Sequence, residues 1–251
     1  MSEQNRVKTL IRIVTIALSG ILIVFVFNNQ LFSLNGIIGG DWPYFFPEQL
    51  REFPLIPYSW SSSTNLGSPT VSPWIDTYLN SVVYLFFNKF GLSWILVQKI
   101  FFFFIPILLS TFSITILWRA LFKKFSLIPL FIYIFNTYFL MLYGGGQMGV
   151  VLAYSVAPLV LASFIKTINY SNFNEKIKDH PFDKLRAKIK DAIFAGLVLA
   201  LQVLFDPRIA YITMIAVFIL MLSYILSDLL GKKKLILNTL YFHSCYDCYF
   251  A

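Results

Sequence analysis

The chain has 251 residues, of which 58% are hydrophobic and only 13% are charged, and its mean hydropathy is +0.72. Soluble globular domains carry about 25% charged residues, so this composition excludes an ordinary soluble domain and predicts a membrane protein. The net charge of +8 does not indicate nucleic-acid binding, because the basic residues lie in clusters between apolar runs and form no continuous polar face.

Apolar runs predict the membrane spans, since a helix needs roughly 17 to 25 residues to cross the hydrocarbon core. We expect spans at residues 10–27, 100–117, 125–143, 148–165, 192–205 and 209–229. The first run is longer than the apolar part of a signal peptide, about 7 to 15 residues, and no A-x-A-like site follows, so we interpret it as a retained anchor. The fifth is short and is expected to begin inside the preceding basic segment, near Ala187.

Basic residues mark the orientation of these spans. With a cytoplasmic N-terminus, sixteen of the twenty Lys and Arg residues fall in segments expected inside the cell. The four expected outside are Arg51, Lys89, Lys99 and Arg208. By the positive-inside rule, this bias predicts a multi-pass protein of the cell membrane with a cytoplasmic N-terminus.

The expected fold is therefore an all-α, polytopic transmembrane helical bundle of about six spans, with interfacial helices in a long first external loop. The expected parts are the cytoplasmic N-terminus and first span (1–27), the external loop (28–99), a five-span bundle with a cytoplasmic basic loop at 166–191 (100–230), and a cytoplasmic tail or interrupted seventh span (231–251). Four tryptophans of the loop region are typical of an aromatic belt at the membrane interface; they are Trp42, Trp60, Trp74 and Trp94.

An acid stands just beyond the outer end of the first span, in "NGIIGGDWPYFFPEQL", residues 35–50. Asp41 follows two glycines and precedes Trp42 and Pro43, so the backbone can turn sharply there and present a carboxylate at the membrane surface. Trp42 beside it is a candidate for contact with a ligand. No D-x-D or paired acid follows Asp41, so we expect no metal ligand set at this position, and a divalent metal ion is the only cofactor left open.

This arrangement resembles the GT-C glycosyltransferases, multi-span enzymes that transfer a sugar from a polyprenyl-phosphate carrier to an acceptor outside the cytoplasm. In that superfamily the first external loop is long, carries interfacial helices and holds an acidic residue near the end of the first span. The resemblance implies that Asp41 is the catalytic residue. It also implies three partners: the membrane lipids, a lipid-linked sugar donor, and an extracytoplasmic glycan or protein as acceptor.

Glycosyl transfer from a lipid phosphate needs a base for the acceptor hydroxyl and positive charge beside the departing phosphate. Asp41 is the candidate base. Arg208, in "LFDPRIAY" at residues 204–211, is the candidate phosphate ligand, because a guanidinium offers planar paired donors, and Asp206 beside it is a further candidate. The alternative is structural, with Asp206 and Arg208 capping and pairing at a helical hairpin.

Two further external features complete the predicted site. The turn "YGGGQMG", residues 143–149, either makes a tight hairpin or lets the backbone approach a ligand, and Gln147 is its polar side chain. Asp76, in "SPWIDTY", is either a second functional acid or an acid that favours a helix N-terminus. We expect Asp41, Gln147 and Arg208 to meet at one membrane face.

The last residues break the pattern. After Lys234 an apolar run "LILNTLYF" gives way to "HSCYDCYFA", which indicates the front part of a longer, truncated or frameshifted protein whose enzyme would be inactive as this fragment. Cys245 and Cys248 form one C-x-x-C, which is half of a zinc site, and we interpret them as structurally inert. Two cysteines imply no disulfide framework.

Two other classes of function stay open. A non-catalytic membrane scaffold or assembly protein would need no external acid, and the long loop rich in tryptophan would then bind a partner. A transporter or lipid flippase would show internal repeats and interrupted helices with ionisable groups at mid-membrane. The sequence shows no repeat and no charge at the span centres, so the transporter ranks last.

Overall fold

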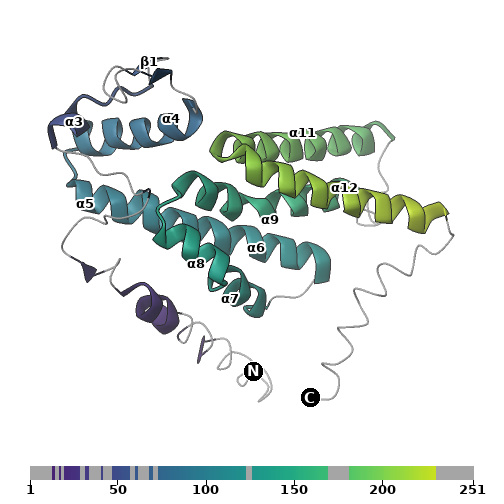
Figure 1. The fold of residues 1–251 in the computed structure, drawn as a ribbon. Helices are drawn as coiled ribbons and strands as arrows, with labels where there is room; N and C mark the ends of the chain where they lie inside the picture. Colours follow the sequence, from purple (N-terminus) through teal and green to yellow (C-terminus); the bar gives the residue numbers. More distant parts are fainter. Residues whose placement is uncertain are drawn as a thin grey trace. The chain divides into compact units, whose positions relative to one another are not determined.

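The computed structural model describes residues 13, 14, 17, 20–28, 32, 33, 41, 47–56, 60, 61, 68, 69, 73–122, 126–168 and 181–229. Over these residues the fold is all-α (Figure 1), apart from an antiparallel pair of two-residue strands, β1 (Trp60–Ser61) and β2 (Ser68–Pro69). The chain divides into two compact units. Unit 1 comprises residues 1–108 and 131–148, and unit 2 comprises residues 109–130 and 149–251.

In unit 1, short helices precede one long helix. Residues 20–26 are helical, and α3 (Pro47–Arg51) and α4 (Pro73–Val82) follow, the latter continuing as a stretch of π-helix, η1 (Val83–Lys89). The chain then turns through Gly91, whose φ of +68° favours glycine. Ser93 caps the next helix by accepting a hydrogen bond from the Leu96 amide at 3.4 Å.

The long helix runs without interruption from Trp94 to Phe122 as α5 (Trp94–Val97), η2 (Gln98–Phe104) and α6 (Ile105–Phe122). It therefore begins at Trp94, inside the segment expected to be an external loop, whereas the apolar run predicted a start at residue 100. The Ser93 cap starts the helix at Trp94, about one turn before the polar residues Gln98 and Lys99. The long apolar run begins only after these two residues, so it predicts a later start.

An aromatic cluster forms the core of unit 1. Phe27, Phe103 and Tyr143 contact one another edge to face, with ring centroids 5.2 to 5.5 Å apart, and all three are buried. The Tyr143 hydroxyl donates a hydrogen bond to the Phe102 carbonyl at 2.8 Å. The end of the first predicted span is thus joined to η2 and to the helix that carries Tyr143.

The third predicted span is interrupted. Residues 125–143 form two helices, α7 (Ile128–Ile134) and α8 (Thr137–Gly144), separated at Phe135 and Asn136. The Asn136 side chain caps α8 through the Phe139 amide at 2.8 Å and donates to the Tyr133 carbonyl of α7 at 2.6 Å. Asn side chains compete with the helical backbone in this way, and this one bonds to the end of α7 and to the start of α8.

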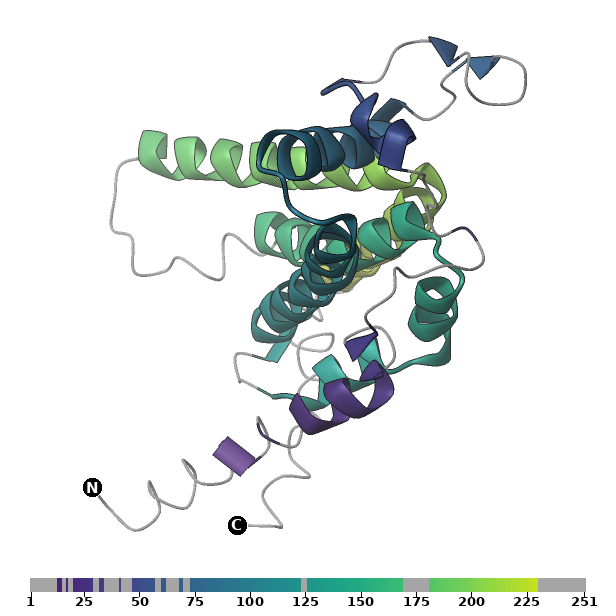
Figure 2. The same ribbon diagram turned by 90° about the vertical axis from the view of Figure 1, so that its left-hand side faces the viewer.

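Unit 2 is built from the rest of α6 together with α9 (Met148–Ile168), α11 (Pro181–Phe205) and α12 (Pro207–Leu229). α11 and α12 form a helical hairpin that turns at Asp206 (Figures 1 and 2). The core gathers around Val156 and Val160 of α9 and Val198 of α11. Within unit 2, α9 is the most enclosed apolar helix, with 67% of its most apolar stretch buried, against 22% for α12.

Polar contacts add to this packing. The Ser110 hydroxyl of α6 donates to the Ser155 hydroxyl of α9 at 2.9 Å, and Ser155 donates to the Val151 carbonyl at 2.7 Å. Such hydroxyls typically join helices at small-residue contacts. Lys166 of α9 pairs with Asp191 of α11 at 2.8 Å, so these two helices are also linked near the end of α9.

Among the described residues, three helices are long and apolar enough to cross a membrane: Trp94–Phe122, Met148–Ile168 and Pro207–Leu226. They correspond to the second, fourth and sixth predicted spans. The fifth prediction falls in α11, which begins at Pro181, so the described parts of the expected loop at 166–191, residues 166–168 and 181–191, are helical. The first span is described only in part, and the tail at 231–251 lies outside the described residues.

Candidate functional site

Asp41 is bound to the glycine-rich turn after α8. Its amide donates a hydrogen bond to the Gly145 carbonyl at 2.7 Å, and its side chain is exposed. These two segments are far apart in the sequence, and both belong to unit 1. The structure therefore joins two of the three features that the sequence predicts to be external.

The turn itself is a Schellman motif that ends α8. Gly145 is the C-cap, and Gly146 has a left-handed φ of +75°. The Gln147 amide donates to the Leu142 carbonyl at 3.1 Å, and the Gly146 amide donates to the Tyr143 carbonyl at 3.2 Å. This pair of bonds is the signature of the motif, which satisfies carbonyls at a helix end by placing a glycine in the left-handed region. We call residues 145–147 the glycine turn.

The three glycines of this region are not equivalent. Gly146 holds a backbone conformation that L-residues rarely adopt. A Cβ on Gly145 would lie 3.1 Å from the Met141 carbonyl oxygen, which is tight. A Cβ on Gly144, the last residue of α8, would have nothing within 4 Å. Glycine is therefore needed at position 146 for its backbone conformation, and it is favoured at position 145 because a side chain has little space there.

The segment that leads to Asp41 is tied to unit 1 at three described points. Phe27 lies in the aromatic cluster, the Ser33 carbonyl accepts a hydrogen bond from Lys99 Nζ at 2.7 Å, and the Asp41 amide is bound to Gly145. Lys99 belongs to η2, one helical turn before Phe103 of the cluster. The position of Asp41 thus depends on η2 and α8 and not on the loop alone.

The other predicted residues of the external loops are placed as follows. Gln147 has an exposed side chain and stands two residues after Gly145, in the same unit as Asp41. Asp76 is near the N-terminus of α4, and its side chain lies outside the described ones. Trp42 lies outside the described residues. Of these three residues, Gln147 alone lies in a segment with a described contact to Asp41, the hydrogen bond between the Asp41 amide and the Gly145 carbonyl.

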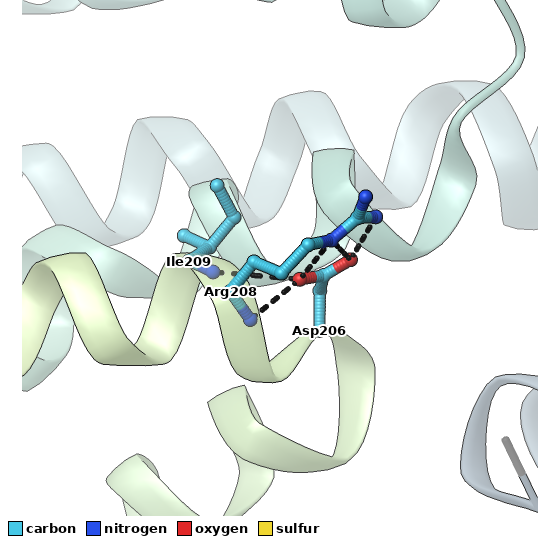
Figure 3. A network of polar contacts seen from close by, with 3 residues as sticks. All are labelled: Asp206, Arg208 and Ile209. Carbon is cyan, nitrogen blue, oxygen red and sulfur yellow. Dashed lines mark hydrogen bonds and ion pairs between the residues drawn. The ribbon is translucent and has the colours of Figure 1, made fainter.

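Asp206 and Arg208 form a two-pronged ion pair at the start of α12 (Figure 3). Arg208 Nη2 is 2.7 Å from Asp206 Oδ2, and Nε is 3.1 Å from Oδ1 and 3.2 Å from Oδ2. Asp206 Oδ1 also accepts the amides of Arg208 at 2.8 Å and Ile209 at 3.4 Å, with Pro207 at the first helical position. This is the capped and paired hairpin that stands as the structural alternative for these residues.

The ion pair is unequally exposed, because the side chain of Asp206 is 4% exposed and that of Arg208 is 75% exposed. Burial by itself raises the pKa of the Asp206 carboxyl, but the hydrogen bonds from the Arg208 side chain and the amides, together with the guanidinium charge, outweigh it. The net effect lowers the pKa of Asp206 from its ordinary value of 3.8. Asp206 is therefore ionised at neutral pH, and its charge is used within the hairpin.

A buried glutamine one turn before Asp206 was not singled out by the sequence. Gln202 is fully buried, and its Nε2 donates to the Ala153 carbonyl of α9 at 3.1 Å and to Thr213 Oγ1 of α12 at 2.8 Å. Its Oε1 has no hydrogen-bond partner among the described residues. The signal was a single Gln in an otherwise apolar run, and its role here is to link α9, α11 and α12.

The predicted convergence of three external residues is thus divided between the units. Asp41 and Gln147 belong to unit 1, and the Asp206–Arg208 pair belongs to unit 2. Over the described ranges, no group of three or more His, Cys, Asp or Glu side chains could hold a metal ion. The class that the fold defines is an all-α protein with three helices compatible with a membrane.

No protein-family model matches the chain, and neither the curated proteins nor the solved structures contain a match.

Proposed function

We propose that the protein is a multi-pass membrane glycosyltransferase that transfers a sugar from a polyprenyl-phosphate donor to an extracytoplasmic glycan or protein. The observation that carries the proposal is the exposed Asp41 carboxylate on a backbone held by the glycine turn. A carboxylate held near the outer end of the proposed first span is suited to activating a hydroxyl group.

The proposed topology has six spans and a cytoplasmic N-terminus in the cell membrane. It is supported by the three long apolar helices and by the clustering of Lys and Arg in alternate connections. In this topology Asp41, the glycine turn and Arg208 face outward, where a lipid-linked donor presents its sugar. The interrupted α7–α8 pair counts as one crossing, which Asn136 makes compatible with a bilayer by serving both helix ends.

The proposed chemistry is a displacement at the anomeric carbon. The acceptor hydroxyl oxygen attacks that carbon while Asp41 takes the hydroxyl proton, and the bond from the carbon to the phosphate oxygen breaks with its electrons leaving on the polyprenyl phosphate. Gln147 orients the sugar or the acceptor through its amide. Arg208, which belongs to unit 2, stays a separate candidate for a phosphate ligand, because its side chain is exposed and a guanidinium has five donors.

The direct test replaces Asp41 with Asn in the full-length protein and measures sugar transfer from a polyprenyl-phosphate donor in reconstituted vesicles. A general base contributes about 10²- to 10⁴-fold to rate, so we expect turnover to fall by at least about a hundredfold. Glu52→Gln is the matched control, because Glu52 is an exposed acid of the same loop. Unchanged turnover in the Asp41→Asn protein would exclude Asp41 as the base, whereas absence of transfer in the wild-type protein would favour the scaffold or assembly role.

A second candidate function is movement of a lipid-linked sugar across the membrane, and the interruption between α7 and α8 favours it. Transporters commonly use discontinuous helices at mid-membrane to bind substrate. The same vesicles separate the two functions, since a lipid transporter moves the donor between leaflets without forming a glycosidic bond. We rank this candidate below the glycosyltransferase, because the described backbone at the interruption is bonded to Asn136.

A further inference from the structure

We infer that the glycine turn is a positioning device for Asp41, in which the left-handed conformation of Gly146 ends α8 and leaves the Gly145 carbonyl to accept a hydrogen bond from the Asp41 amide. The catalytic consequence of this inference rests on the proposed function, but the positioning itself does not. The sequence left open whether this turn makes a hairpin or a close approach to a ligand. The structure shows a close approach to the backbone of Asp41.

The geometry of a trans peptide determines where the Gly145 carbonyl points. In the peptide between Gly145 and Gly146 the C=O and N–H groups point in opposite directions. The Gly146 amide points back to the Tyr143 carbonyl at 3.2 Å, so the Gly145 carbonyl points away from that turn of α8. It is the carbonyl that meets the Asp41 amide at 2.7 Å. A residue at position 146 that instead continued the helix would let the amide of residue 149 take this carbonyl, and the Asp41 amide would then lose its acceptor.

The helix end that carries the turn is itself held firmly. Tyr143 is buried against Phe27 and Phe103, and its hydroxyl is bonded to the Phe102 carbonyl at 2.8 Å. Phe27 begins the segment that leads to Asp41, so one helix end holds both the start and the end of that segment. A rearrangement of the turn should therefore displace the backbone of Asp41 more than the aromatic cluster.

Such anchoring leaves the Asp41 side chain exposed but fixes its backbone. A carboxylate that must meet an acceptor hydroxyl gains from this, because only the two side-chain torsions are left to search. Gly146 is accordingly a positioning residue, which acts through Asp41 and not on the substrate.

The test compares three variants of the full-length protein: Gly146→Ala, Gly146→Asn and Gly144→Ala. Asn adopts the left-handed region more readily than Ala, so it is the conservative replacement. Gly144→Ala is the matched control, since it adds the same methyl group at the last residue of α8, just before the turn, where there is open space. Hydrogen–deuterium exchange of the peptide that contains Asp41 reports on the hydrogen bond directly.

We expect Gly146→Ala to raise the exchange rate of the Asp41 amide by about tenfold or more, while Gly144→Ala leaves it unchanged and Gly146→Asn lies close to the wild type. Exchange in α11 and α12 serves as the check on folding and should not change. In the transfer assay, Gly146→Ala should lower kcat by about tenfold with little change in the KM for the donor.

Three results would overturn the inference. The first is a freely exchanging Asp41 amide in the wild-type protein, and the second is unchanged protection in Gly146→Ala. The third is an equal loss in Gly146→Ala and Gly146→Asn, because bulk and not backbone conformation would then be responsible. If protection changes as expected while no variant, including the wild type, transfers sugar, the positioning role stands and the proposed function fails.

Discussion

Truncating Asp206 to Ala is expected to destabilise the protein by about 1 to 2 kcal/mol, while replacing it with Asn should cost less than about 1 kcal/mol. The Ala variant loses both roles of the carboxylate. As the cap of α12 it accepts one short bond from the Arg208 amide at 2.8 Å and one long bond from the Ile209 amide at 3.4 Å, so we assign about 1 kcal/mol to capping. The Asn variant keeps a capping oxygen and loses only the charge.

The ion pair is worth less than its short distance suggests. Although Arg208 Nη2 lies 2.7 Å from Asp206, the Arg208 side chain is 75% exposed, and water screens the attraction to about 0 to 1 kcal/mol. The control is Asp191→Ala, which breaks the equally short pair with Lys166 at 2.8 Å but removes no helix cap. We expect that control to cost about 0.5 kcal/mol or less.

Thermal and denaturant unfolding in detergent, followed by circular dichroism, would measure these differences. Because the folded state lowers the pKa of Asp206 below 3.8, its contribution is present above that pH and is lost as the pH falls through the lowered pKa. The gap between wild type and Asp206→Ala should therefore narrow in acid, whereas it should be constant from about pH 5 to about pH 8, a range chosen well above the pKa. Equal stability of the wild-type, Asp206→Ala and Asp206→Asn proteins would refute the capped-hairpin interpretation.

The remaining predictions concern a buried phenol and the faces of two helices. The Tyr78 hydroxyl donates a hydrogen bond to the Phe101 carbonyl at 3.0 Å, and burial raises the pKa of this phenol to about 12. An ultraviolet titration should therefore show a late-ionising tyrosine that the Tyr78→Phe substitution removes. The contribution of Tyr78 to stability is present below its ordinary pKa of 10.0 and is lost as the pH rises toward 12. An identical titration of the wild-type and Tyr78→Phe proteins above pH 10 would contradict the burial of Tyr78. Phe218, 65% exposed on α12, should be labelled by a photoactivated carbene probe dissolved in the bilayer, whereas Val156, fully buried in α9, should be labelled at least about tenfold less. Equal labelling of the two residues would contradict the central place of α9 in unit 2.

Composition and apolar runs predicted the all-α fold and located three of the helices that could cross a membrane. The runs did so because length and hydropathy alone decide whether a helix is able to span a bilayer. They missed the interruption at Asn136, since one polar residue in a long apolar run does not change the average. The local signal was present, because an Asn followed by Thr is a favourable start for a helix.

Helix starts were predicted less well than helix existence, for a physical reason. The helices that begin at Trp94 and Pro181 start in segments with charged or polar residues, outside the apolar runs. Such residues are tolerated in the part of a helix that lies outside the core. Hydropathy reports burial, whereas a cap such as Ser93 reports where the helical backbone starts. The two signals need not coincide.

For the candidate site, the sequence located the residue types and left their roles open. The two alternatives at Asp206 and Arg208 differ in geometry and not in composition, and the paired cap is what the structure contains. The use of Arg208 for a donor phosphate stays a prediction. Gln202 escaped notice because a buried amide that joins three helices looks, in sequence, like a lone polar residue on an apolar helix.

The contact between Asp41 and the glycine turn could not have been predicted from the sequence, and the reason bears on its function. A hydrogen bond between two backbone groups leaves no trace in side-chain identity at the donor. What the sequence does carry is the requirement at the acceptor, since a left-handed residue after Gly145 ends α8 and leaves that carbonyl without a partner in a following helical turn. If Asp41 is the catalytic base, substitutions that lower the rate of transfer should therefore be found at Gly146, which touches no substrate, as well as at Asp41. If Asp41 served only solubility, substitutions at Gly146, far away in the sequence, would not lower transfer by displacing it.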